Sequence, residues 1–395
     1  MNEQELIQII KNGETSKVQF KQDFDNQDKI ASEIIAMSNA YGGIIIFGVE
    51  DKSGKIVGLD YERLQFIGNK LATIANDLVK PQVFIMVEVI TIEDDAINDI
   101  NNKKILVAYI DEGTAKPYKD NNGTIWMKQS ADKRKVTDNN ELLRLFQQSG
   151  TVFVDEMTVP DTSIEDIDSE KVKEYIQKTI KNPDEYKNIE KKILYQNLNI
   201  LKKENLTLGG VLFFSKEPQL HCPLFCVKAI AFYGNDLGGL HYRDSRNLTG
   251  SIPELFYESM QFFKANLRHE QKGQNFNSTG ILEISEIALE ELIQNALIHR
   301  DYTQNSPIRL MIFDNRIEIS SPGRLPNNLT VENIKLGTAV VRNNLIASYA
   351  SKILKYRGFG TGIIRALNEQ PNIEFSNNVE CNHFITKIPR MTLDE

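Results

Sequence analysis

Residues 290–300 read EELIQNALIHR, and residues 357–363 read RGFGTGI. In the first stretch Glu291 and Asn295 stand four positions apart on a segment with the apolar spacing of a helix, so both side chains lie on one helix face. The second stretch is a glycine-rich loop that leads into a helix, and such loops present backbone N–H groups to a phosphate. Together they predict a nucleotide site in which Asn295 ligates Mg²⁺ and Glu291 orients or activates water.

Three glycines of the second stretch are the predicted phosphate contacts: Gly358, Gly360 and Gly362. A simpler interpretation stays open, because an amphipathic helix with an exposed Glu and Asn is common, and so is a glycine that ends a helix. The order of the parts favours a site, since a strand and a loop are expected between the helix and the glycines.

The composition is that of a globular protein with more than one domain. A chain of 395 residues is too long for one ordinary core, and 41% hydrophobic and 25% charged residues are typical of water-soluble proteins. No run of eighteen apolar residues occurs, so no membrane span is predicted. Three cysteines complete no zinc site and are typical of a reduced cytoplasm, which is the expected location. The net charge of −8 gives no general attraction to nucleic acid, so such binding needs a local basic surface.

Three regions are predicted along the chain, and the expected fold class is mixed α+β. Residues 1–150 alternate between helix and strand patterns and form one α/β unit. Residues 155–170 contain seven acidic residues, no basic one and Pro160, a composition typical of a linker. Residues 151–279 form a middle region for which a scaffold or dimer contact is expected, and residues 280–395 form the last unit.

Hydrophobic periodicity predicts the individual elements. Helices are expected at 3–10, 27–39, 61–79, 141–147, 169–181, 253–267, 285–298, 341–352 and 362–368. Strands are expected at 18–24, 44–49, 82–92, 104–109, 124–128, 206–214, 225–233, 308–313, 316–320 and 384–388. The sequence contains no internal repeat and no low-complexity segment.

Sequence motifs along nearly the whole chain resemble those of a bacterial two-module family. ETSKVQFKQDF at 14–24, SNAYGGIIIFGVEDKSGKIVGL at 38–59 and WMKQSADKRK at 126–135 resemble the AlbA_2 domain shared with Schlafen proteins. EELIQNALIHRDY, RIEISSPGRLP, RNNLIA and RGFGTGI resemble the GHKL (Bergerat-type), RecG-C-terminal-like ATPase module. TLGGVLFFSKEPQ and LTGSIPELFYESM are similar to the region that connects the two modules. The resemblance implies an AlbA_2-like domain, a connecting region and a C-terminal α/β sandwich.

The resemblance also implies an adenine contact. GHKL sites bind the adenine amino group through the Asp of a DxGxG loop. The corresponding loop here is SPGRL at 321–325, with Ser321 in the Asp position and Gly323 in that of the first glycine. Because a neutral hydroxyl replaces a charged acceptor, and charge-assisted hydrogen bonds are the stronger kind, ATP binding is expected to be weakened and hydrolysis more so.

A metal-dependent nuclease site is the second implication. Schlafen-type nucleases use three carboxylates with Mg²⁺ or Mn²⁺, a hard cation that needs oxygen ligands and activates water. Glu14 matches the first acid and Asp51, or its neighbour Glu50, matches the third, whereas Gln19 stands where the second acid belongs. Metal affinity should therefore be low, and the alternative is that these are ordinary polar residues at a strand edge.

Nucleic-acid binding is predicted for a basic segment that contains an aromatic ring. An aromatic side chain can stack on a base while neighbouring cations hold backbone phosphates. A solvated basic turn is the plainer alternative. The residues assigned to nucleic-acid binding are Lys21, Trp126, Lys128, Lys133, Arg134 and Lys135.

HRDY at 299–302 is also found in kinase catalytic loops, but the kinase interpretation is rejected. Asn305 follows Asp301 by four positions rather than five, and no DFG occurs downstream. His299, Arg300 and Asp301 are instead expected to cap the helix and pair locally.

Three hypotheses for function remain. The first is a nucleic-acid-binding regulator of transcription or a phage-defence protein that contacts DNA or RNA, senses ATP with Mg²⁺ and assembles as a homo-oligomer. The second is a Schlafen-type nuclease that uses Mn²⁺ or Mg²⁺. The third is a scaffold with two inactive sites. Weak ATPase activity is compatible with the first, and no membrane partner is expected.

Overall fold

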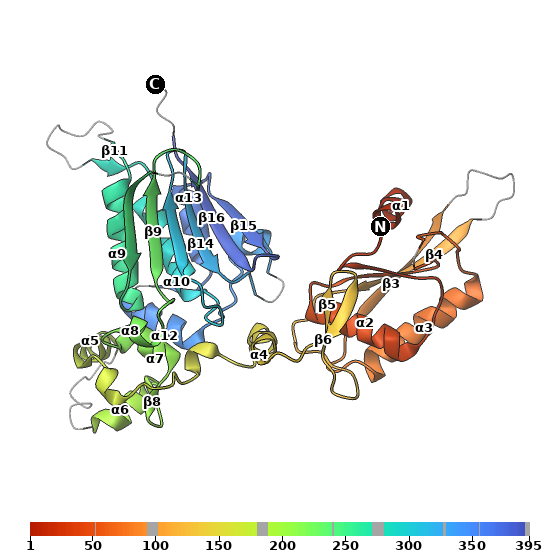
Figure 1. The fold of residues 1–395 in the computed structure, drawn as a ribbon, viewed down its shortest axis with the longest axis horizontal. Helices are drawn as coiled ribbons and strands as arrows, with labels where there is room; N and C mark the ends of the chain where they lie inside the picture. Colours follow the sequence, from red (N-terminus) through yellow and green to blue (C-terminus); the bar gives the residue numbers. More distant parts are fainter. Residues whose placement is uncertain are drawn as a thin grey trace. The chain divides into compact units, whose positions relative to one another are not determined.

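The computed structural model describes residues 1–51, 53–92, 102–179, 189–238, 241–270, 280–326, 329–354 and 356–391. The chain divides into two compact units, Met1–Val152 and Phe153–Glu395 (Figure 1). Each unit combines a β-sheet with helices, which confirms the mixed α+β fold class.

The first unit is built on a four-stranded sheet in the order β1–β2–β4–β3. Its strands are β1 (Val18–Lys21), β2 (Gly43–Phe47), β3 (Ile85–Ile92) and β4 (Lys103–Ile110). β1 runs parallel to β2, and β4 is antiparallel to both β2 and β3. Because successive side chains of a strand point to opposite faces, Ile45 and Phe47 enter one hydrophobic core and Ile46 enters the other.

Helices cover both faces of this sheet (Figure 1). The core on one face is completed by α2 (Gln27–Asn39) and α3 (Tyr61–Asp77), and the core on the other by Leu6 and Ile10 of α1 (Glu3–Asn12). Every residue of α2 from Ile30 to Asn39 is buried, including the charged Glu33.

A β-hairpin and one further helix complete the first unit. They are β5 (Trp126–Gln129), β6 (Asp132–Lys135) and α4 (Asn139–Gln148). The sequence predicted a strand at 124–128 and missed β6. The side chain of Asn39 donates hydrogen bonds to the carbonyls of Tyr118 and Trp126, which attaches the hairpin to α2.

The second unit contains a six-stranded sheet in the order β10–β9–β13–β14–β16–β15. Its strands are β9 (Val227–Phe232), β10 (Tyr242–Leu248), β13 (Ile308–Ile312), β14 (Arg316–Pro322), β15 (Glu374–Asn378) and β16 (His383–Pro389). β9 and β13 are parallel, and the other neighbouring strands are antiparallel.

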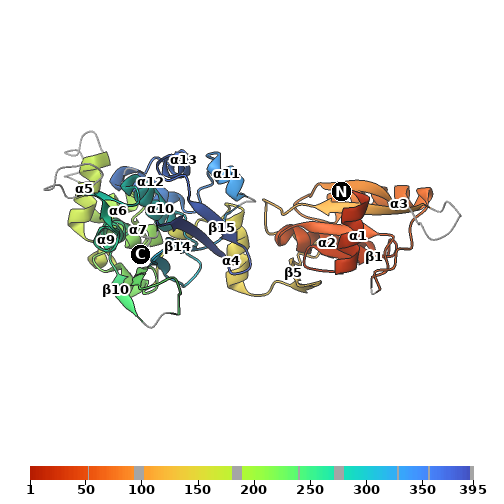
Figure 2. The same ribbon diagram turned by 90° about the horizontal axis from the view of Figure 1, so that it is seen from above.

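Helices that pack against one another lie on one face of the sheet (Figure 2). They are α9 (Ile252–Asn266), α10 (Glu286–Ile298) and α13 (Thr361–Glu369). α10 contacts β14 and lies between α9 and α13. Leu310, Ile312 and Ile319 are buried, whereas the alternate positions include charged Arg309 and Glu318, so the unit is a two-layer α/β sandwich.

Further elements make up the rest of the second unit. They are the 3₁₀ helices η1 (Val154–Glu156) and η2 (Ile164–Asp166), the helices α5 (Ser169–Thr179), α6 (Lys191–Asn197), α7 (Leu208–Phe214), α8 (Pro218–His221), α11 (Val331–Lys335) and α12 (Asn344–Ile353), and the short strands β7 (Leu201–Lys202), β8 (Asn205–Leu206), β11 (His269–Glu270) and β12 (Ile281–Leu282). Positions 180 and 181 of the predicted helix 169–181 lie outside the described residues. None of the described helices has both the length and the apolar character needed to cross a membrane.

The predicted strand at 206–214 is wrong, because most of this segment forms helix α7. All seven residues of α7 are buried, and a short apolar run buried on every side fits either a strand or a helix. Thr207 decides the outcome locally: its hydroxyl oxygen accepts a hydrogen bond from the backbone N–H of Gly210, which caps a helix start.

The division at residue 279 also needs correction. β9 and β10 come from the predicted middle region, yet they belong to the sheet formed by residues 308–389. Because the pairing of β9 with β13 joins residues about eighty positions apart, periodicity along the chain could not show it.

The acidic segment 155–170 is not a solvated linker. It lies in the second unit, where Asp155 has no exposed surface. The Oδ2 atom of Asp155 accepts a hydrogen bond from the backbone N–H of Ile346 (2.9 Å) in the first turn of α12. Burial raises the pKa of Asp155 to about 6, although hydrogen bonds from α12 act in the opposite direction.

Asp155 should make the stability of the second unit depend on pH. Its folded-state pKa lies above the unfolded value, so its contribution is fully present below pH 4 and is lost as the pH rises through 6. We expect Asp155→Asn to remove this component, about 2–3 kcal/mol of unfolding free energy between pH 4 and pH 7. Urea unfolding at a series of pH values measures it.

Asp161→Asn is the matched control, because Asp161 is an exposed acid of the same segment. It should leave the pH dependence of the wild type unchanged. The interpretation fails if the wild type and Asp155→Asn show the same change in unfolding free energy across this range.

Candidate functional site

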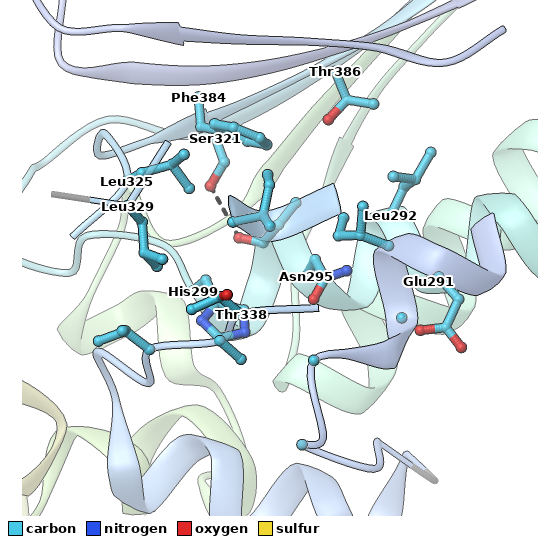
Figure 3. Close-up of a pocket in the computed structure, with 18 of the residues that line it drawn as sticks. Glu291, Leu292, Asn295, His299, Ser321, Leu325, Leu329, Thr338, Phe384 and Thr386 are labelled. Carbon is cyan, nitrogen blue, oxygen red and sulfur yellow. Dashed lines mark hydrogen bonds between the residues drawn. The ribbon is translucent and has the colours of Figure 1, made fainter. Parts of the chain in front are cut away.

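Helix α10 presents a row of polar side chains to a pocket in the second unit (Figure 3). Glu291 and Asn295 stand one helical turn apart, and His299, the residue that ends the helix, continues the row by another four positions. All three line the pocket together with Gly358, Gly360 and Gly362. The structure thus brings the two stretches of sequence to one place.

The sheet forms another wall of the pocket. Ile319 and Ser321 of β14 line it, and so do Phe384 and Thr386 of β16, which stand opposite Ser321 and Ile319 in the strand register. Apolar side chains from helix α11 and the loops beside it complete the lining: Leu325, Pro326, Leu329, Ile334 and Val340. The pocket holds about 1000 Å³ of empty space, part of it open to solvent. A mostly apolar pocket lined by a few polar groups is typical of a small-molecule site.

The glycine loop ends at the start of α13. Gly360 is the N-cap residue with φ +72°, and no described side chain caps the first turn. The N–H groups of that turn therefore remain available to an anion. A Cβ atom on Gly360 would overlap the carbonyl oxygen of Gly337, so both the backbone angle and the close approach require glycine here.

Ser321 has a defined hydrogen-bond role in the pocket wall. Its hydroxyl donates to the carbonyl oxygen of Ala296 on α10 at 3.0 Å (Figure 3). Since the proton is used there, Oγ can act towards the pocket only as an acceptor. Gly323, two positions later, lines the same pocket with φ +106°, and a Cβ atom there would overlap Arg342 and Asp301.

Glu291 is held by an ion pair. Its Oε1 atom lies 2.5 Å from Nη2 of Arg365, a residue of α13. Burial raises the pKa of Glu291, and the neighbouring Arg365 opposes this shift. The carboxylate predicted to orient water therefore already has a charged partner, which sequence reasoning missed because the two residues lie 74 positions apart.

His299 and Tyr356 form a second polar contact in the pocket. The Nε2 atom of His299 and the hydroxyl of Tyr356 are 2.9 Å apart. Burial, with Arg342 nearby, lowers the pKa of His299 to about 4, so the imidazole is neutral at physiological pH. Sequence reasoning assigned His299 only to local capping. The spacing of eight residues from Glu291 could have shown that it continues the same helix face.

The first unit buries a network of charged and polar side chains near Glu14. Gln19 donates to Glu14, and the backbone N–H of Phe20 donates to the same carboxylate oxygen at 2.7 Å. Nζ of Lys128 lies 3.0 Å from Oε1 of Gln19 and 3.2 Å from Oε2 of Glu33. Lys133 pairs with the other oxygen of Glu33, an acid that sequence reasoning did not single out.

Lys128 is therefore not a surface residue. Its side chain is 1% exposed, because α2 and the β5–β6 hairpin enclose it, so the prediction that Lys128 contacts nucleic acid is not supported. Lys21 and Asp51 form a separate pair, with 2.5 Å between Nζ and Oδ2.

The remaining predicted cations lie on strand β6. Both terminal nitrogens of Arg134 donate to the carboxylate of Glu141 at 2.8 and 2.7 Å. Nζ of Lys135 lies 5.5 Å from the centre of the Trp126 ring. Arg134 and Lys135 are exposed, and Trp126 is partly buried against the α2–α3 core.

Comparison with family models separates the two units. Residues 14–137 match the model described as "Schlafen, AlbA_2", and residues 305–379 match "ATP-dependent DNA helicase recG C-terminal". The chain is a fusion of a Schlafen-type AlbA_2 domain and a RecG C-terminal-like domain. Residues 143–227 match a domain of unknown function. The RecG-like match contains Ser321 and the glycine loop, whereas Glu291 and Asn295 precede it.

No curated protein matches the chain. A crystal structure of the DIP2311 protein from Corynebacterium diphtheriae is similar at 18% identity with a TM-score of 0.46, covering 95% of this chain and 75% of that one. The AlbA_2 and RecG-like domains together indicate a nucleic-acid-related function.

The pocket of the RecG-like domain fits a nucleotide with a divalent cation. Nδ2 of Asn295 is buried and has no hydrogen-bond partner among the described residues, so its amide is available to a ligand. The Oδ1 atom of the same side chain is the kind of oxygen that Mg²⁺ prefers. The uncapped turn after Gly360 suits phosphate, and the apolar wall suits a base.

The AlbA_2 domain does not fit a catalytic metal. Within the part of the chain that the structure describes, no three His, Cys, Asp or Glu side chains are placed to hold one ion. The ammonium groups of Lys128 and Lys21 instead lie against oxygens of Gln19, Glu33 and Asp51. Of the two acids predicted to hold the metal, Asp51 is neutralised by Lys21, and Glu14 accepts hydrogen bonds from Gln19 and from the backbone of Phe20.

Lys128 should behave as a structural residue. We expect Lys128→Met to lower the unfolding free energy of the AlbA_2 domain by about 3 kcal/mol, because it leaves part of a buried charge on Glu33 without its partner. Urea unfolding measures the change.

Lys135→Met is the control with the same replacement on the exposed side of the hairpin. It should change the unfolding free energy by no more than about 0.5 kcal/mol. Equal effects of the two substitutions would contradict the structural role of Lys128.

Proposed function

We propose that this protein is a nucleic-acid-binding regulator or defence protein whose RecG-like domain binds ATP with Mg²⁺. The observation that carries the proposal is the convergence of Asn295, Glu291 and the uncapped glycine loop on one apolar pocket. The AlbA_2 domain would contact DNA or RNA. Homo-oligomer formation remains a prediction that a sizing experiment can test.

Each part of the pocket has a distinct role in this proposal. Asn295 would ligate Mg²⁺, which neutralises phosphate charge when bound. The backbone N–H groups after Gly360 would hold phosphate oxygens. The Oγ atom of Ser321, whose proton goes to Ala296, would accept a hydrogen bond from the adenine amino group. A neutral acceptor makes this contact weaker than a carboxylate would.

The ion pair of Glu291 with Arg365 favours ATP binding over ATP hydrolysis. A carboxylate that is paired with Arg365 at 2.5 Å has less capacity to orient or deprotonate water. We therefore propose that the RecG-like domain mainly senses ATP, and that any hydrolysis is slow.

In the AlbA_2 domain, the exposed face of the β5–β6 hairpin supports nucleic-acid binding. Lys135 lies against the Trp126 ring, and Arg134 is held at the surface by Glu141. Cations beside an aromatic ring can hold phosphate and stack a base. Lys128 and Lys133 support this face from below through Glu33.

Mg-ATP binding tests the nucleotide site. We expect Asn295→Ala to weaken Mg-ATP binding about tenfold or more, because a metal ligand and a buried amide are lost together. Isothermal titration calorimetry with a non-hydrolysable ATP analogue measures the affinity. Asn305→Ala, at an exposed position outside the pocket, should leave it unchanged. The absence of any binding to the wild type would refute the nucleotide-sensing role.

Labelled tRNA and DNA test the AlbA_2 domain. We expect the double variant Arg134→Ala/Lys135→Ala to weaken binding and to reduce the salt dependence by one to two phosphate contacts, about 0.7–0.9 in logarithmic slope for each. Lys11→Ala, an exposed cation on α1, is the control.

The same substrates incubated with Mn²⁺ distinguish the nuclease alternative. We expect no metal-dependent cleavage, since Lys128 and Lys21 occupy the oxygens that a metal would need. Cleavage that is present in the wild type and absent in Glu14→Ala would establish a Schlafen-type nuclease instead.

A further inference from the structure

The ion pair between Glu291 and Arg365 lies where the pocket meets α13. Nη2 of Arg365 is 2.5 Å from Oε1 of Glu291, and their side chains are 32% and 14% exposed, so most of the pair is removed from water. Both residues line the pocket, and Arg365 lies three positions after Gly362. The other oxygen of Glu291 is so close to Gly362 that a Cβ atom there would meet it.

Arg365 has unused hydrogen-bonding capacity. Its Nε atom is buried and has no partner among the described residues. A guanidinium carries five N–H donors in a planar fork that suits phosphate oxygens as well as carboxylates. Arg365 therefore uses only some of its N–H donors on Glu291. The glycine loop beside it suits phosphate.

Glu291 is also poorly satisfied on its own. Burial raises the pKa of its carboxyl, and Arg365 is the first of the groups that oppose this effect. A partly buried carboxylate without a counter-ion is unfavourable, so Arg365, and after it Arg357, stabilise the charged form of Glu291. An anion of higher charge that enters the pocket would compete for Arg365.

We propose that Glu291 and Arg365 form a latch that the terminal phosphate of a nucleoside triphosphate opens. Without ligand, Arg365 is bound to Glu291. With a triphosphate bound, the guanidinium pairs with the terminal phosphate, and Glu291 loses its counter-ion. The latch rests on the proposed nucleotide site and adds to it a means of distinguishing a triphosphate from a diphosphate.

A simpler role makes a different prediction. Arg365 could serve only to fasten α13 to α10, which are in contact along this face. In that case its loss would affect diphosphate and triphosphate binding equally. Glu291 could also act only by repelling phosphate, and its neutralisation would then strengthen binding whether or not Arg365 is present.

A double-mutant cycle separates these cases. Binding of Mg-ADP and of a magnesium-bound non-hydrolysable ATP analogue is measured by calorimetry for wild type, Glu291→Gln, Arg365→Met and the double variant. We expect Arg365→Met to weaken the triphosphate about tenfold and Mg-ADP less than about twofold. Glu291→Gln should strengthen triphosphate binding about fivefold in the wild type and have no effect when Arg365 is absent.

The outcomes are distinct. If Glu291→Gln strengthens triphosphate binding equally with and without Arg365, the latch is overturned and Glu291 acts by repelling phosphate. If Arg365→Met leaves the ratio of triphosphate to diphosphate affinity unchanged, the latch is overturned and Arg365 only attaches α13 to α10. If Arg365→Met does not fold, Arg365→Lys replaces it. A single ammonium should lower that ratio at least threefold, and an unchanged ratio again overturns the latch. Failure of the wild type to bind any nucleotide refutes the proposed function itself.

Discussion

The burial of α10 is the constraint on which the second unit depends. This helix contacts the sheet at β14 and lies between α9 and α13, so it is apolar on nearly every side. Along one line of the helix, Glu291, Asn295 and the terminal His299 line the pocket. The position of the helix therefore determines which groups the pocket contains and which way they point.

Hydrogen bonds to the end of α10 fix the segments around the pocket. Ser321 donates to the carbonyl of Ala296, and the side chain of Asn343 donates to the carbonyls of Ile298 and Arg300 just beyond the helix end. These bonds satisfy backbone groups at and near the end of α10 that would otherwise be buried without partners. They also hold β14 and the start of α12 against the helix, which brings the glycine loop to the pocket.

Internal cations occupy both predicted sites. In the AlbA_2 domain Lys128 lies against Gln19 and Glu33, and in the RecG-like domain Arg365 lies against Glu291. The physical reason is the same, because a buried carboxylate needs a counter-charge. The two sites differ in what can replace the cation. Lys128 is enclosed, whereas Arg365 lines an open pocket and retains an unpartnered Nε atom.

The sequence by itself determined the elements with clear periodicity and the local groups within them. The boundaries of α2 were predicted to the residue, and the i, i+4 placement of Glu291 and Asn295 follows from helix geometry alone. Tertiary structure decided the rest: α7 as a helix, β9 and β10 in the last sheet, Asp155 in the interior, and the pairs Glu291–Arg365 and Glu33–Lys128. Short-range patterns record which face of an element is apolar, but the partner of a buried charge is chosen by chain segments that meet only when the protein folds.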